Sequence, residues 1–102
     1  MQESLKSPSL LINKQITQNN IRKMANKAVS NNLKFRPHFK THQSMEIGNW
    51  FKDFSIDGIT VSSLDMAQYF ADAGWKSITI ALPINVLQVE QINELAKIID
   101  LR

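Results

Sequence analysis

The sequence predicts an α/β fold in which short strands alternate with helices around a parallel sheet. Two β-branched segments, residues 59–62 (ITVS) and 77–82 (SITIAL), are typical of buried strands, and each precedes a segment with helical spacing of apolar residues. The strand-plus-helix unit recurs about every 20 residues, which is typical of βαβ connections. Because a closed (β/α)8 barrel needs about 250 residues, the 102-residue chain predicts either the first three or four units of such a barrel, which we favour, or a small open α/β sheet.

The N-terminal third predicts two strands separated by a helix. Residues 9–13 (SLLIN) form a short apolar run after Pro8 and are expected to form a strand. Residues 16–28 carry apolar side chains at helical spacing, with Thr17 as the expected N-cap. Residues 34–40 predict the next strand, which must accommodate a proline at an edge, a bulge or an unpaired position.

Helix caps mark the units that follow. Ser44 is expected to cap a helix whose apolar stripe runs through residues 47–54. Ser62, with Asp65 three residues later, has the form of a capping box for the next helix. Pro83 stops the strand at residues 77–82, and a further helix follows it.

The composition favours a cytoplasmic globular protein. The hydrophobic fraction is 43%, too high for a disordered chain, and no apolar run reaches the roughly 18 residues of a membrane span. The first nine residues lack the basic-then-apolar pattern of a secretion signal, and cysteine is absent. We therefore expect no membrane partner and no disulfide.

Basic residues gather in two clusters, one at Arg22, Lys23 and Lys27 and the other at residues 34–42. These clusters could attract phosphate on a nucleic acid or on a small cofactor. The net charge is a modest +3. The aromatic residues Trp50, Phe51 and Phe54 have the spacing of one inward helix stripe, so we expect them in the core rather than stacked on bases. The sequence thus predicts no nucleic-acid partner.

Residues 36–42 (RPHFKTH) carry the strongest functional signal. They place Lys40 among three other basic side chains, at the point where a predicted strand meets a predicted helix. A lysine held among cations can lose its proton near neutral pH, and the neutral amine can attack a carbonyl. If the segment stays extended, side chains two apart share a face, and that face would hold Arg36, His38, Lys40 and His42.

With its neighbours, this motif resembles a known family. The R-P-H-x-K-T-H core is specific, and it stands in familiar order with residues 7–11 (SPSLL), 58–62 (GITVS), 73–74 (AG) and 80–83 (IALP). Together these segments resemble the N-terminal part of the D-threonine aldolase and D-serine dehydratase group, which are pyridoxal-phosphate (PLP) enzymes of the alanine racemase fold. The resemblance covers nearly the whole chain.

The resemblance implies a (β/α)8 barrel followed by a β-rich domain. Residues 1–14 would be an N-terminal strand that belongs with the missing β-rich domain, and residues 15–102 would be an incomplete PLP-binding barrel. Lys40 would be the catalytic residue that bonds to PLP at the carboxyl end of the first barrel strand. Family members also use a divalent metal, with ligands that would lie beyond Arg102, so the chain alone is expected to be inactive.

The resemblance leaves the roles of the other motif residues open. Arg36 would either hold an anion and lower the pKa of the amine or form a structural ion pair. His38 and His42 have the spacing of a metal pair on a helix, but not on a strand interrupted by proline, so we expect no metal site. Thr41 would orient the lysine or cap the next helix. The cofactor-binding set implied is Lys40, Arg36, His38, Thr41 and His42.

The expected function is that of a PLP-dependent lyase acting on D-β-hydroxy amino acids. The first reading is retro-aldol cleavage to glycine and an aldehyde, as in D-threonine aldolase. One alternative is β-elimination to a 2-oxo acid and ammonia, as in D-serine dehydratase, and another is a non-catalytic truncated barrel. The expected partner is a small D-amino acid, and the full-length form would be a homodimer or a monomer.

Overall fold

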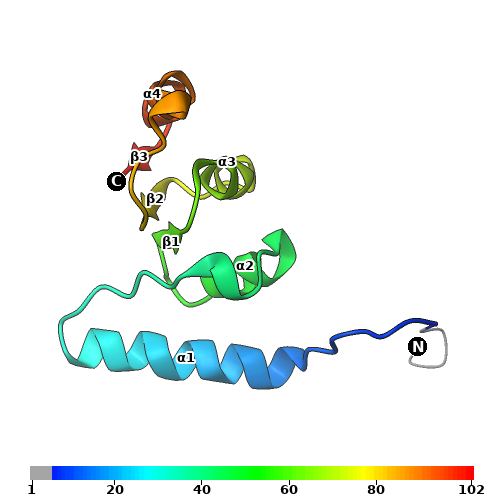
Figure 1. The fold of residues 1–102 in the computed structure, drawn as a ribbon. Helices are drawn as coiled ribbons and strands as arrows, with labels where there is room; N and C mark the ends of the chain where they lie inside the picture. The colour runs from blue at the N-terminus through cyan, green and yellow to red at the C-terminus, as the bar shows by residue number, and fades with distance from the viewer. Residues whose placement is uncertain (1–5) are drawn as a thin grey trace.

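After two consecutive α-helices, strands and helices alternate along the chain in the computed structural model, which describes residues 6–102. Figure 1 shows a stack that begins with α1 at one end and finishes with α4 and β3 at the other. The elements are α1 (Lys14–Ser30), the 3-10 helix η2 (Phe39–Thr41), α2 (Met45–Lys52), β1 (Ile59–Val61), α3 (Leu64–Asp72), β2 (Ser77–Ile80), the 3-10 helix η3 (Val86–Gln88), α4 (Val89–Ala96) and β3 (Asp100–Leu101).

The strands form one parallel sheet in the order β1–β2–β3, in which Thr60 is paired with Thr79. A single parallel bridge between His38 and Thr60 adds a short segment next to β1, where the Thr60 N–H donates to the Pro37 carbonyl at 2.9 Å. Pro37 is tolerated there because it offers the ladder only its carbonyl. Helices α2, α3 and α4 lie on one side of the sheet (Figure 1). The predicted mixed α/β fold with a parallel sheet is confirmed.

Phe39 occupies the centre of the apolar core beneath these helices. Its side chain is fully buried, and its ring centroid lies 5.0 Å from that of Phe51, 4.8 Å from Phe70 and 5.3 Å from Trp75. Gly48 of α2 permits this approach, because a Cβ at that position would lie 3.0 Å from the Phe39 ring. The sheet contributes fully buried side chains to the same core, namely Ile59, Val61 and Ile78.

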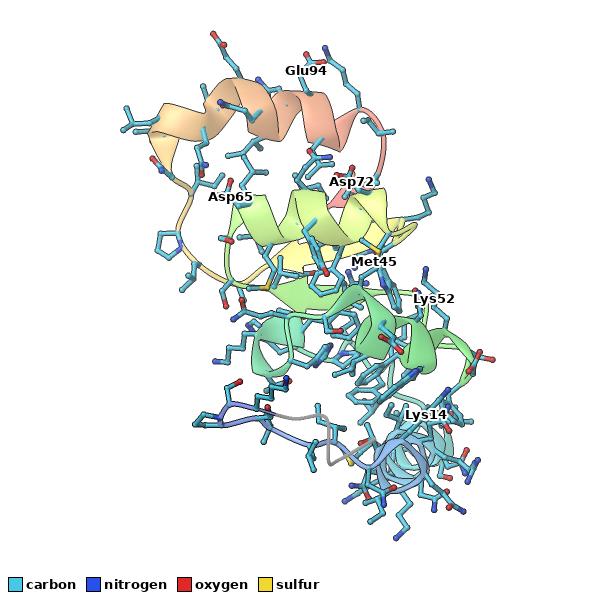
Figure 2. The ribbon with its side chains drawn as sticks, turned by 90° about the vertical axis from the view of Figure 1, so that its right-hand side faces the viewer. Lys14, Met45, Lys52, Asp65, Asp72 and Glu94 are labelled. Atoms are coloured by element: carbon cyan, nitrogen blue, oxygen red, sulfur yellow. The ribbon has the colours of Figure 1, made fainter. Side chains whose placement is uncertain are left out.

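Two lysine side chains at helix ends contact aromatic rings at the surface of this core. Figure 2 shows Lys52 at the end of α2, where its Nζ donates to the Ala73 carbonyl at 2.8 Å and lies 5.1 Å from the Trp75 ring. At the start of α1, the Lys14 ammonium lies 5.4 Å from the Trp50 ring of α2. Both cations thus cover aromatic rings at helix ends, where such contacts stabilise by about 0.5–1 kcal/mol at exposed sites.

The opposite face of the sheet is polar and is organised around Arg36. The Arg36 guanidinium donates from Nη1 to Ser77 Oγ at 3.0 Å and from Nη2 to the Ile59 carbonyl at 3.5 Å. Ser77 Oγ donates in turn to Asp100 Oδ2 at 3.1 Å. Gly58 makes room for the guanidinium, since a Cβ there would overlap Nη1 and lie 2.7 Å from Cζ. The polar face is therefore cross-linked from the segment before β1 through to β3.

Residues 9–13, which were predicted to be a strand, form none within the described part of the chain. Residues 6–13 enter no ladder, and Leu10 is 88% exposed. A strand needs a hydrogen-bonding neighbour, and none of the residues that the structure describes lies beside this segment as a strand. The first five residues of the predicted N-terminal strand 1–14 lie outside the described part of the chain.

The strand predicted for residues 34–40 is reduced to the bridge at His38, because the chain turns into η2 at Phe39. Two predicted caps are also wrong by sequence position: Asn13 rather than Thr17 caps α1, and Ser63 rather than Ser62 caps α3. In each case the capping oxygen accepts from the N–H three residues later, which fixes the first turn. Ser44 caps α2 as predicted.

The molecule is flatter and more open than a compact domain of its length. Its radius of gyration is 15.6 Å, whereas about 13 Å is expected for a compact domain of this size. Large apolar side chains are exposed on the N-terminal arm and around η3, among them Leu10, Leu11, Ile84 and Leu87. Within residues 6–102, no helix has the length and apolar character needed to cross a membrane.

We expect the isolated 102-residue chain to self-associate. The free edges of the sheet and the exposed apolar side chains favour pairing with further copies. Sedimentation velocity at increasing protein concentration should show oligomers, and a dye that binds exposed apolar surface should fluoresce. A monomer with one cooperative unfolding transition would contradict this expectation.

We expect the substitution Gly58→Ala to loosen β1 through a clash with the Arg36 guanidinium. Because the clashing atoms are the end of a flexible side chain, the cost is expected to be about 1 kcal/mol, that of a hydrogen bond to Ser77 or Ile59 lost when the guanidinium moves, and Arg36→Ala should relieve most of it. Mass spectrometry measures hydrogen exchange of peptides covering β1 in the two single variants and the double variant. The comparison gives the coupling free energy between residues 36 and 58. Equal acceleration by Gly58→Ala with and without the Arg36 side chain would rule out the proposed clash.

Candidate active site

The lysine of the RPHFKTH motif lies on a short turn that is held at both ends. His38, in extended conformation, is the N-cap of η2, and its Nδ1 accepts a hydrogen bond from the Lys40 N–H at 3.2 Å. After the turn, the Gln43 N–H donates to the Phe39 carbonyl at 3.0 Å, and the Gln43 side chain donates to the Lys40 carbonyl at 3.2 Å. The backbone of Lys40 is thus bound on both its N–H and its C=O.

The turn changes which side chains share a face. A 3-10 helix has three residues per turn, so Phe39 and His42 point to the same side. The His42 ring packs edge-on against Phe39 at 4.5 Å and stacks on Phe51 at 5.6 Å. The cationic face that an extended segment would give to Lys40 and His42 is therefore not formed.

Lys40 itself is exposed, and its ammonium forms no ion pair with a carboxylate among residues 6–102. The bridge between His38 and Thr60 runs parallel, so the turn lies at the carboxyl edge of the sheet, beside the residues that follow β1. Ser62 Oγ lies 3.5 Å from His38 Nε2 at this edge. The structure thus groups Lys40, His38 and Ser62.

Both histidines favour their neutral forms. Burial lowers the pKa of His38 below its ordinary 6.5, and the nearby charge of Lys40 lowers it further. Burial alone lowers the pKa of His42. Each ring therefore binds fewer protons in the folded state than in the unfolded state, and its contribution to stability is lost as the pH falls below about 6.5.

Arg36 lies away from Lys40, at the amino edge of the sheet. Its guanidinium is bound to Ser77 at the start of β2 and to the Ile59 carbonyl at the start of β1, while Nε is buried without a hydrogen-bond partner among the described residues. This geometry favours the structural alternative for Arg36, with Ser77 interposed between it and Asp100. Hydrogen bonds from Arg102 and Ser77 lower the pKa of Asp100.

Thr41 joins the two histidines through its hydroxyl. Its Oγ1 lies 3.1 Å from His42 Nδ1 and 3.5 Å from the His38 carbonyl. The α2 cap is Ser44, so Thr41 does not cap that helix, and of its two expected roles only orientation of the turn remains.

Two residues that matter here, Gly58 and Ser77, were identified in the sequence only as parts of longer segments, and neither was connected with Arg36. Gly58 could have been found from the strand register. If His38 pairs with Thr60 in parallel, Arg36, two residues earlier, lies beside Gly58, two residues before Thr60. Ser77 needed the tertiary structure, because 41 residues separate it from Arg36.

A cavity of about 460 Å³ opens beside the turn, between α1, α2 and the segment before η2. Its lining is mainly apolar and includes His38, Thr41 and His42, but not Lys40. Across the described residues 6–102, no group of three or more His, Cys, Asp or Glu side chains has an arrangement that could hold a metal ion.

Comparison with known proteins identifies relatives along most of the chain. No family model matches. D-serine dehydratase from Dictyostelium discoideum is 32% identical over an alignment 102 positions long, which covers 95% of this chain and 26% of that protein. The solved structure of D-threo-3-hydroxyaspartate dehydratase from Delftia sp. HT23 superposes with a TM-score of 0.86 at 29% identity, over 92% of this chain and 25% of that one.

D-threonine aldolase from Filomicrobium marinum shares the fold, with a TM-score of 0.87 at 24% identity over 94% of this chain and 26% of that one. The chain thus spans about a quarter of the length of the relatives it matches. The predicted resemblance is confirmed: D-serine dehydratase and D-threo-3-hydroxyaspartate dehydratase are homologues of this chain, which also shares the fold of D-threonine aldolase.

Proposed function

We propose that this chain supplies the lysine-bearing part of a PLP-dependent lyase that acts on D-β-hydroxy amino acids, with Lys40 as its catalytic residue. The observation that carries the proposal is the exposed Lys40 amine, held on a capped turn at the carboxyl edge of a parallel sheet. In α/β barrels this edge is where catalytic groups lie. The names of the relatives, two dehydratases of D-amino acids, support the substrate class.

The donor set fits an aldehyde cofactor. Condensation with an aldehyde needs a primary amine that is free of a carboxylate, and Lys40 has no such partner within residues 6–102. When bound, PLP withdraws the electrons of the bond that breaks at the substrate Cα. Lys40 would hold the cofactor by its Nζ and, once replaced by the substrate amine, could take the proton from Cα.

The remaining motif residues would support this lysine. We propose that His38 and Thr41 orient the turn on the cofactor side. In this proposal the His42 ring holds the other side of the turn by stacking on Phe51, and Arg36 stabilises the polar face of the sheet at its amino edge. All of them belong to the cofactor-binding segment in this proposal, although only Lys40 bonds to the cofactor.

The polar, uncovered face of the sheet fits the inner wall of a (β/α)8 barrel. We propose that residues 15–102 form the first units of such a barrel and that residues 1–14 belong with a β-rich domain. A structure of the hydroxyaspartate dehydratase is described as a metal-free form, which implies a metal in that relative. In our proposal a divalent metal is bound by residues outside this chain.

Two reactions are compatible with this site. The first candidate is retro-aldol cleavage, and the second is β-elimination. Elimination begins with loss of the Cα proton, whereas retro-aldol cleavage begins with loss of the β-hydroxyl proton. The relatives matched at 29–32% identity are named as dehydratases, which supports elimination, while the aldolase shares the fold at 24% identity.

We expect PLP to attach selectively to Lys40. After incubation with PLP and reduction with borohydride, peptide mapping should find the pyridoxyl group on Lys40 in preference to Lys34, an exposed lysine of the same segment. Lys40→Arg should abolish the preferred label, and the matched control Lys34→Arg should leave it unchanged. Labelling of all lysines in proportion to their exposure would contradict the proposal.

We expect the whole protein to release a 2-oxo acid and ammonia, or glycine and an aldehyde, from D-β-hydroxy amino acids, and the isolated chain to release neither. Lys40→Ala should lower the rate by at least about 10²–10⁴-fold, since it removes the group that moves the proton. Coupled assays for 2-oxo acid and for aldehyde, run with D-serine and D-threonine, separate the two reactions. Full turnover by Lys40→Ala would exclude Lys40 as the catalytic residue.

A further inference from the structure

We propose that His38 is a positioning residue for Lys40, whose neutral ring, protonated on Nε2, connects the lysine-bearing turn to the end of β1. The inference rests on the proposed role of Lys40 and adds a device that holds it. His38 acts through the backbone of Lys40 and through Ser62, so it positions the lysine rather than reacting itself.

The first contact of the ring is with the turn. His38 has the extended backbone of an N-cap (φ −91°, ψ 117°), and its Nδ1 accepts from the Lys40 N–H at 3.2 Å. The turn is only three residues long, so it has few internal hydrogen bonds and depends on such caps. Loss of this one bond would leave the Lys40 N–H without its acceptor.

The second contact of the ring is with the sheet. Nε2 lies 3.5 Å from the Oγ of Ser62, the residue directly after β1. The ring therefore links the Lys40 turn to the end of the neighbouring strand, two residues beyond the backbone bridge at Thr60. With contacts at both nitrogens, it resists movement of the turn along the sheet edge.

These two contacts determine where the ring carries its proton. A backbone N–H can only donate, so Nδ1 must be the acceptor and cannot be protonated. The neutral ring then carries its hydrogen on Nε2, which donates to Ser62 Oγ. The lowered pKa of His38 agrees with this neutral state.

The ring geometry separates this role from ordinary capping. Asn is among the preferred N-cap residues and can supply the same acceptor, but its short side chain cannot also reach Ser62. His38→Asn should keep the bond to Lys40 and lose the link to the sheet, whereas His38→Leu loses both. Ser62→Ala removes only the link.

The variants are tested first without cofactor, by amide hydrogen exchange of peptides that cover Lys40. His38→Leu should accelerate exchange of the Lys40 amide by about five- to tenfold, as expected for a lost cap, and His38→Asn should restore most of the protection. Ser44→Ala, which removes the cap of α2, is the matched control and should act on α2 instead. Unchanged exchange at Lys40 in His38→Leu, or equal acceleration in His38→Asn, would overturn the proposal.

The position of the ring proton is tested by the ¹⁵N chemical shifts of the His38 ring in magic-angle-spinning NMR. This method can be applied even if the chain forms oligomers. A shift typical of N–H at Nε2 and of a bare nitrogen at Nδ1 is expected, and the reverse pattern would overturn the proposal. Selective labelling of Lys40 by PLP and borohydride should fall about fivefold or more in His38→Leu and return only in part in His38→Asn, which keeps the bond to the Lys40 N–H but loses the link to Ser62. Full return in His38→Asn would reduce the role of His38 to capping and overturn the proposal. If wild-type Lys40 is not labelled at all, the proposed function fails, while the exchange and NMR results still decide the role of His38.

Discussion

The burial of the Phe39 ring is the constraint on which the lysine-bearing segment depends. Full burial of a side chain of this kind contributes about 1.5–3 kcal/mol, more than the roughly 1 kcal/mol of a single hydrogen bond at the turn. The ring is fully buried and packs against Phe51, Phe70 and Trp75. Once Phe39 is fixed, the preceding residue, His38, meets the end of β1 and the following residue, Lys40, faces solvent.

The two faces of the sheet differ in the side chains that they carry and in what covers them. The apolar face is covered by α2, α3 and α4 and holds Phe39 in place (Figure 1). The polar face carries the Arg36–Ser77–Asp100 network, and it has no second layer among residues 6–102. An uncovered polar face and a flat overall shape are what a segment of barrel wall would show, and relatives about four times as long share this fold.

Much of the architecture could be predicted because it depends on local patterns. The strands at Ile59 and Ile78 follow from β-branched runs, and the Ser44 cap follows from one side chain and its nearest N–H groups. The strand at residues 9–13 could not be judged in this way, since a strand exists only beside a partner. The capping residue of α3 was missed by one position because the adjacent serines carry the same hydroxyl group, and in the structure Ser63 accepts from the Met66 N–H.

The sequence by itself determined the parallel α/β class and the resemblance to D-amino acid dehydratases, and it led to the hypothesis that Lys40 is catalytic. Only the tertiary structure decided the side on which each neighbour of that lysine lies. His42 is turned into the core because a 3-10 turn at Phe39 replaces the expected strand. Arg36 lies at the amino edge because the parallel bridge of His38 with Thr60 places it beside Gly58. The reason is physical: alternation along a strand is a local rule, whereas the turn is set by aromatic packing with residues far along the chain.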